Sequence, residues 1–296
     1  MVDNQQFKHI EKIRLTMEEN NYLAGQPSLI AKIEESSFIN DGRVSQLRWY
    51  FPKMAATDEL VVLVHGGGYI AGSITTHDVM ARKIANENQI DLVSFGYSLA
   101  PEYKFPSQVN DLIALLEHIK KLDTYKKIIL LGDSAGGTIV AESLEKIITS
   151  QSDLKQIIVG QVLLYAALSF EFKTASIEKL SDHYFPSRPV LEENRDFYLN
   201  GLSDIADPLV SPLNREEFTD FPPTFVLVEE LDPLRDEGLM LFKKIDGPLG
   251  NQKNNQLVDA KNVKHGFLQY FVQPENQEAS KQTFEALKNF IKNVTK

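Results

Sequence analysis

The sequence predicts an α/β domain in which helices cover both faces of a mostly parallel β-sheet. Short runs that are almost continuously apolar recur along the chain, as expected for strands that a sheet buries on both faces. Patterns with helical spacing separate these runs, and such alternation of β and α segments is typical of a doubly wound domain. A chain of 296 residues, of which 43% are hydrophobic, can bury a large core. We therefore expect one main domain over residues 1–296.

The expected elements follow in order along the chain. An amphipathic helix over about residues 5–20 comes first, and residues 43–51 predict antiparallel strand material. Six further strands are expected at residues 60–64, 92–96, 128–131, 157–164, 224–228 and 256–259. Apolar stripes predict helices over residues 107–121 and 277–292. A polar, aromatic-rich segment at about 171–205 breaks the alternation, which predicts an insertion over one end of the sheet.

Composition excludes several classes of protein. The chain has 31 Lys and Arg against 41 Asp and Glu, a net charge of −10, and no basic block, so nucleic acid is not an expected partner. The absence of cysteine excludes disulfides, thiolate catalysis and cysteine-ligated zinc. Residues 1–15 lack the apolar core of a signal peptide, and no apolar run is long enough to span a membrane. A cytoplasmic, soluble protein without a membrane span is expected.

The stretch GDSAGG at residues 132–137 matches the G-x-S-x-G nucleophile elbow. A serine on a sharp turn between strand and helix has a strained backbone and an exposed hydroxyl, and bulky residues two positions away would collide with the flanking elements. The context fits, because an apolar strand precedes Ser134 and a helical pattern follows it. A plain glycine-rich turn is the alternative, and the position between strand and helix favours the nucleophile.

A second glycine-rich stretch, HGGGY at residues 65–69, directly follows an expected strand. Three successive glycines let backbone N–H groups converge on an anion, as an oxyanion hole requires. A phosphate loop is the competing interpretation, but neither the Walker pattern nor the G-x-G-x-x-G fingerprint is present. We interpret His65 as a brace for this loop.

A serine nucleophile needs a base, and the base needs a carboxylate. His265 lies just after the last expected strand beside a glycine that permits a turn, whereas His9, His77 and His118 are interpreted as solvated or capping residues. Asp232 follows the strand at 224–228. The order Ser, Asp, His along the chain is that of α/β-hydrolases, and all three residues follow strands, where ligands of such sheets bind.

Six motifs in one order extend over most of the chain: HGGGY at 65–69, YSLAPEYKFP at 97–106, GDSAGG at 132–137, DPLVSPL at 207–213, DPLRDEG at 232–238 and HGF at 265–267. With these motifs the chain resembles the hormone-sensitive lipase-like family of carboxylesterases, which implies an α/β-hydrolase fold. The resemblance implies Ser134 as nucleophile, Asp232 as acid and His265 as base. It implies oxyanion donors at three backbone N–H groups, those of Gly67, Gly68 and Ala135. It also implies a helical cap, formed by about residues 1–40 with about 171–205.

Departures from the family pattern leave the substrate open. Ser98, Tyr103 and Thr138 stand where many relatives have arginine, histidine and asparagine. Four residues are expected to contact substrate: Tyr69, His183, Tyr184 and Phe185. A wider set of aromatic residues either lines an apolar pocket or packs the insertion onto the core: Phe170, Phe172, Tyr184, Phe185, Phe197 and Tyr198.

The predicted function is hydrolysis of short-chain acyl esters, small-molecule substrates, through a Ser-His-Asp triad and an acyl-enzyme. Hydrolysis or deacetylation of an amide uses the same residues and stays an alternative. A non-catalytic receptor for a small ligand on the same fold is another, disfavoured because the base His265 is present. No cofactor and no metal are expected, since the histidines show no ligand spacing. The relatives leave a homodimer open.

Overall fold

A computed structural model describes residues 3–55, 58–202, 204–251 and 253–296. Its centre is an eight-stranded sheet in the order β1-β2-β4-β3-β5-β6-β7-β8. The strands are β1 (Lys32–Asn40), β2 (Arg43–Phe51), β3 (Glu59–Val64), β4 (Asp91–Phe95), β5 (Lys127–Asp133), β6 (Ile158–Leu164), β7 (Thr224–Leu231) and β8 (Gln256–Lys264). All pairs from β4 to β8 are parallel, while β1 and β2 add an antiparallel edge. The mostly parallel sheet predicted from the sequence is confirmed.

Strand β1 corrects one expected boundary. Residues 32–40 were included in the predicted cap, but they pair with β2 along their whole length. The apolar signature is missing because β1 is an edge strand, and of its side chains only Phe38 is buried. The helical part of the N-terminal segment therefore ends before residue 32.

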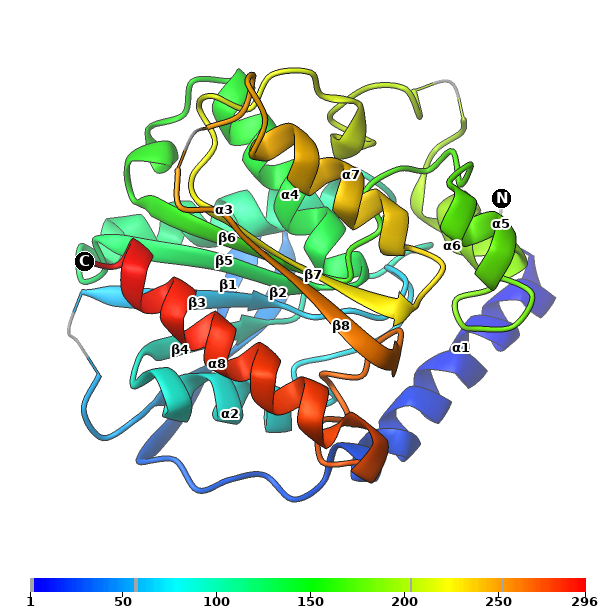
Figure 1. Ribbon diagram of the computed structural model, residues 1–296. Coiled ribbons are helices and arrows are strands. Elements are labelled where there is room, and N and C mark those ends of the chain that lie inside the picture. The colour runs from blue at the N-terminus through cyan, green and yellow to red at the C-terminus, as the bar shows by residue number, and fades with distance from the viewer. Residues whose placement is uncertain (1–2, 56–57, 203, 252) are drawn as a thin grey trace.

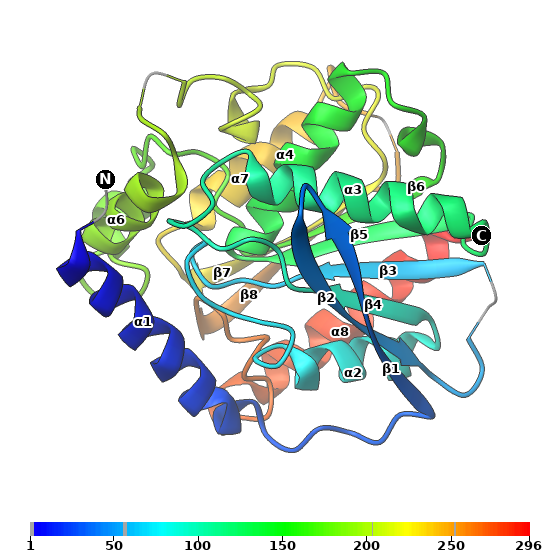
Figure 2. The same ribbon diagram turned by 180° about the vertical axis from the view of Figure 1, so that it is seen from behind.

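Helices cover both faces of the sheet, as Figures 1 and 2 show. One face carries α2 (Asp78–Asn88) and α8 (Gln277–Val294), and the other carries α3 (Ser107–Leu122), α4 (Ala135–Thr149) and α7 (Arg235–Ile245). The predicted helices over 107–121 and 277–292 are confirmed as α3 and α8. Because helices cover both faces, each face of the sheet has its own apolar core, and the side chains of residues 60–64 in β3 are all fully buried.

Further helices gather at the end of the sheet toward which the parallel strands point (Figure 1). They are α1 (Asn4–Glu19), α5 (Ala175–Leu180) and α6 (Arg188–Tyr198). Arg14 attaches α1 to the body, since its guanidinium donates to the carbonyls of Ile70 (2.7 Å) and Ala100 (3.0 Å) and to Glu102 (2.8 Å). None of the helices among the described residues is long and apolar enough to cross a membrane.

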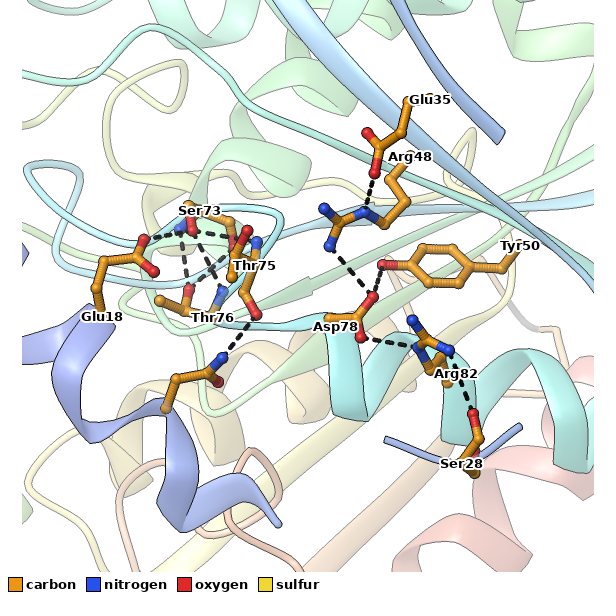
Figure 3. Close-up of polar contacts among 11 residues, drawn as sticks. Glu18, Ser28, Glu35, Arg48, Tyr50, Ser73, Thr75, Thr76, Asp78 and Arg82 are labelled. Atoms are coloured by element: carbon orange, nitrogen blue, oxygen red, sulfur yellow. Dashed lines mark hydrogen bonds and ion pairs between the residues drawn. The ribbon is translucent and has the colours of Figure 1, made fainter. Parts of the chain in front are cut away.

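A charged cluster fixes the β1–β2 edge to α2 (Figure 3). Asp78, in the first turn of α2, accepts hydrogen bonds from Tyr50 (2.9 Å), Arg48 (3.2 Å) and Arg82 (2.8 Å). Arg48 also donates to Glu35 of β1. Each oxygen of the Asp78 carboxylate therefore has a donor, and two guanidinium groups balance its charge.

Candidate active site

Ser134 lies on a sharp turn between β5 and α4. Its φ of 51° and ψ of −123° are strained for a residue with a side chain. The turn is tight because Gly136 packs against β3, where an added Cβ would lie 2.0 Å from the carbonyl oxygen of Val64. The Ser134 N–H donates to Leu164 of β6 (2.8 Å), and this bond keeps the turn in place. The local sequence thus produces the geometry of a nucleophile elbow.

His265 reaches Ser134 from the loop after β8. Its Nε2 lies 2.9 Å from Ser134 Oγ, and its Nδ1 lies 2.8 Å from Asp232 Oδ2. A β-bulge between β7 and β8 makes this possible, since Glu229 pairs with Ala260 whereas Leu231 pairs with Lys264. The extra residues of β8 turn its end toward the serine.

Asp232 is held by its own loop. The side chain is 1% exposed, and Oδ1 accepts a hydrogen bond from the N–H of Leu234 at 2.8 Å. The other oxygen faces the imidazole. The carboxylate therefore orients His265 so that Nδ1 carries the proton and Nε2 can accept one from Ser134.

The glycines after β3 form part of the wall of the cavity that Ser134 and His265 also line. Gly67 and Gly68 have φ values of 126° and 61°, and an added Cβ on Gly67 would lie 2.2 Å from the carbonyl oxygen of Ala71. In the described part of the chain their N–H groups donate to no acceptor. Ala135, the first residue of α4, lines the same cavity with both glycines. Three backbone N–H groups are thus brought to one wall beside Ser134.

Three buried side chains brace this wall from behind. Asp133 accepts the N–H of Gly66 (2.9 Å) on one oxygen and contacts His77 Nε2 (3.1 Å) with the other. Burial lowers the pKa of His65 to about 3, so this imidazole is neutral and stacks on Tyr97. The bracing role predicted for His65 fits its buried position. His77 is fully buried, so the prediction of a solvated position is wrong. It is the N-cap residue of α2, but its side chain makes no capping hydrogen bond and contacts Asp133 at the end of β5 instead.

A cavity of about 780 Å³ opens above Ser134. Of the four residues expected to contact substrate, Tyr69 and Phe185 line it. The exposed His183 and the half-buried Tyr184 lie outside its lining, so for them the structure does not support the expectation. Both residues lie in the turn after α5, where their N–H groups donate to the carbonyl of Leu180. The wider aromatic set divides: Phe170, Phe172 and Phe185 line the cavity, whereas Phe197 and Tyr198 are packed in the core.

Several residues of the site were not identified from the sequence. The face of α1 with Ile13 and Met17 lines the cavity, and His9 of α1 contacts Glu193 of α6 at 3.5 Å. The amphipathic pattern of α1 was a signal for burial but not for what the helix covers. Glu229 was also missed, because a single glutamate in a strand carries no motif.

One group of side chains among the described residues has the composition of a metal site. Ligand atoms of Glu229, Asp232 and His265 lie within 4.8 Å of one another. Asp232 Oδ2 and His265 Nδ1 are already hydrogen-bonded to each other, so a metal ion would have to displace the bond that orients the imidazole.

Residues 61–269 match the sequence profile of a protein family that is described as having the alpha/beta hydrolase fold. The matched range includes Ser134, Asp232 and His265. The chain belongs to this family. The resemblance to the hormone-sensitive lipase-like branch and the predicted α/β-hydrolase fold are confirmed.

Several relatives of this α/β-hydrolase are named as esterases. An arylesterase of Saccharolobus solfataricus is 33% identical over 199 residues, and the match covers 65% of this chain and 63% of the arylesterase, less than two thirds of that relative. The carboxylesterase NlhH of Mycobacterium tuberculosis is 29% identical over 272 residues, and the match covers 88% of this chain and 83% of NlhH. The structure of EstE1, a thermostable carboxylesterase cloned from a metagenomic library, has a TM-score of 0.85 at 29% identity, and the match covers 95% of this chain and 97% of EstE1. Each of these three proteins is thus named for the hydrolysis of esters.

Proposed function

We propose that this α/β-hydrolase cleaves short-chain acyl esters through a covalent acyl-enzyme on Ser134. The observation that carries the proposal is the continuous chain of hydrogen bonds from Ser134 Oγ through His265 to Asp232, at 2.9 and 2.8 Å. A hydroxyl, an imidazole and a buried carboxylate in this order are the parts that serine hydrolysis needs.

In the first step His265 Nε2 takes the proton of Ser134 as the oxygen attacks the ester carbonyl carbon. The C=O π bond opens, and the negative charge moves to the carbonyl oxygen of the tetrahedral intermediate. The N–H groups of Gly67, Gly68 and Ala135 then stabilise this oxyanion. Protonated His265 gives its proton to the leaving alcohol as the C–O bond breaks, and Asp232 stabilises the imidazolium in between.

Water completes the reaction. His265 removes a proton from a water molecule that attacks the acyl carbon, and a second oxyanion forms at the same three donors. The intermediate collapses, Ser134 Oγ leaves with the proton from the imidazolium, and the carboxylic acid is released.

The apolar lining supports a small ester as substrate. Phe170, Phe172 and Phe185 with Ile13 and Met17 make most of the surface near the serine apolar, as an acyl chain requires. An amide hydrolase would use the same triad. A series of esters of increasing acyl length, measured beside the matched amides, discriminates between them, and highest kcat/KM on the shortest esters is the expected result.

The decisive experiment is Ser134→Ala with p-nitrophenyl acetate and butyrate. We expect kcat to fall by at least about 10⁴-fold, because the members of a triad act as a unit. A neighbouring control is Ser150→Ala at the end of α4, which keeps the same helix and leaves the cavity intact. Hydrolysis by Ser134→Ala at the wild-type rate would refute the assignment.

The receptor alternative has its own test. A fluorophosphonate probe forms a covalent bond only with an activated serine. Stoichiometric labelling of the wild type and none of Ser134→Ala is the expected outcome, whereas a folded wild type that resists labelling favours a binding protein. The cytoplasmic location and the homodimer stay predictions, testable by fractionation of the source cells and by light scattering.

A further inference from the structure

A second carboxyl group lies behind the imidazole of His265. Glu229, near the end of β7, is fully buried, three residues before Asp232. One of its oxygens, Oε1, accepts the N–H of Phe267 at 3.3 Å, and the N–H of Gly266 is also bonded to this carboxyl group. The other oxygen, Oε2, is 3.7 Å from His265 Nδ1 and has no hydrogen-bond partner of normal geometry among the described residues. Buried polar atoms without a hydrogen-bond partner are rare in folded proteins, so this one needs a physical explanation.

The charges around Glu229 supply the reason. The titratable groups that face it are Asp232 on the loop after β7, His265 after β8, and Tyr165 after β6. Two carboxylates this close in a dry site cannot both be ionised at low cost. Burial, with the charge of Asp232 second, raises the pKa of Glu229 well above its usual range. The raised pKa favours the protonated form of Glu229, whose proton can bridge Oε2 to Asp232.

The same carboxyl group fixes the loop that carries the imidazole. The β-bulge between β7 and β8 is bound on both sides by consecutive glutamates, because Glu230 accepts the N–H of Asn262 at 2.9 Å while Glu229 accepts the N–H groups after His265. Asn262 has a φ of 57°, so the bulge includes a strained residue that needs such support.

We propose that Glu229 is a positioning residue for the hydrolysis proposed above: its carboxyl group holds the His265 loop, and Oε2 is a reserve acceptor that binds the imidazole Nδ1–H when Asp232 does not. The proposal rests on the assignment of His265 as the base. It adds a fourth side chain to the three of the triad.

The first test uses two substitutions of Glu229. Glu229→Gln keeps a neutral group with an acceptor and a donor, so kcat should stay within about threefold and the acidic limb of the pH–kcat profile should not move. Glu229→Leu removes the acceptor for Gly266 and Phe267, so kcat should fall at least about tenfold with KM within about twofold. Rescue by Gln but not by Leu supports positioning.

Two results would overturn this role. An acidic limb that shifts in Glu229→Gln would mean that the carboxyl is ionised beside the imidazole. Wild-type kcat in Glu229→Leu, with only the Tm lowered, would mean that the carboxyl group serves stability alone. If Glu229→Leu does not fold, the Gln variant and the following comparison still decide the question.

The reserve role is tested without Asp232. In Asp232→Ala the neighbouring negative charge is gone, and Glu229 can ionise and accept the Nδ1–H after a small shift of its side chain. We expect this variant to keep at least about tenfold more kcat than Asp232→Ala/Glu229→Gln, with the difference growing as pH rises. Equal kcat in the single and double variants at every pH would refute the reserve role.

Glu237→Gln is the matched control. Glu237 is also fully buried and also accepts two consecutive backbone N–H groups, those of Leu168 and Ser169, but no contact joins it to His265. Its substitution should leave the residual activity of Asp232→Ala unchanged. Ser134→Ala separates the two proposals. If this variant stays active, the proposed function is wrong. If it is inactive while the Glu229 variants keep the wild-type kcat, only the positioning role is refuted.

Discussion

Two buried aspartates, Asp78 and Asp232, show how differently one fold can treat the same side chain. Asp78 at the β1–β2 edge has three donors, two of them cationic, as Figure 3 shows. Asp232, on the loop after β7, has one imidazole, one backbone N–H and a second acid, Glu229, as its neighbours. The first carboxylate is fully compensated, whereas the second shares a site with an oxygen that lacks a partner.

The two environments suit different purposes: the donors around Asp78 stabilise the fold, whereas the groups around Asp232 suit proton transfer. A charge with matched donors lowers the free energy of the folded state when it is kept and costs several kcal/mol when one partner is removed. At Asp232 the carboxylate faces a protonated acid and an imidazole instead of fixed cations. The imidazole can therefore take up and release a proton, which is what a site for general acid–base catalysis needs. Substitutions of the two aspartates should therefore affect different measurements.

The largest expected effect is at the glycines that line the cavity with Ser134. Gly67→Ala adds a Cβ 2.2 Å from the carbonyl oxygen of Ala71 at a φ of 126°, so the glycine loop must move. We expect kcat on p-nitrophenyl butyrate to fall by about 10²–10³-fold, or about 3 to 4 kcal/mol of barrier, as for the loss of one oxyanion donor. Gly42→Ala is the control, since that glycine also has a positive φ but open space around it, in the β1–β2 turn. Equal losses of kcat in both variants would contradict the prediction.

The next effect is at Asp78. Asp78→Asn leaves Arg48 and Arg82 without their shared counter-charge, and the free energy of unfolding in urea should fall by about 2 to 4 kcal/mol. The kcat of the folded variant should stay within about twofold, because Asp78 and its two arginines lie outside the lining of the cavity. In the control Asp123→Asn, whose side chain is 85% exposed beside Lys126, we expect no measurable change in the free energy of unfolding. Loss of kcat without loss of stability in Asp78→Asn would reverse the comparison.

A third effect concerns Glu237, a buried acid without the cationic donors that surround Asp78. Burial raises the pKa of Glu237 to about 8 from 4.5, so between these pH values the folded state holds a proton that the unfolded chain has lost. The stability that this proton supplies is complete below about pH 4.5 and is lost as pH rises toward 8, by at least about 2 kcal/mol. Glu237→Gln cannot lose the proton, so its Tm should fall less than that of the wild type between pH 5 and 8. Parallel Tm curves would contradict the raised pKa.

The smallest effect is expected at α1, which covers the cavity. Arg14→Gln weakens the attachment of α1 to Ile70, Ala100 and Glu102, so KM should rise about two- to fivefold, near 1 kcal/mol, with kcat within about twofold. Lys8→Gln, on the exposed side of α1, is the control and should leave KM unchanged. An unchanged KM in Arg14→Gln would show that the position of α1 does not matter for substrate binding.

The sequence by itself determined the parallel sheet, the turn at Ser134 and the order of the three residues joined to it. Each of these depends on neighbours along the chain: apolar runs for buried strands, small residues around the serine, and turns after strands. The tertiary structure alone decided what covers the site and what lies behind it. Strand β1 shows no apolar run because it is an edge, α1 lines the cavity from residues more than 100 positions before Ser134, and Glu229 meets His265 only because a bulge aligns β7 with β8. Such contacts between distant segments depend on loop closure and packing, and no local pattern of residue types encodes them.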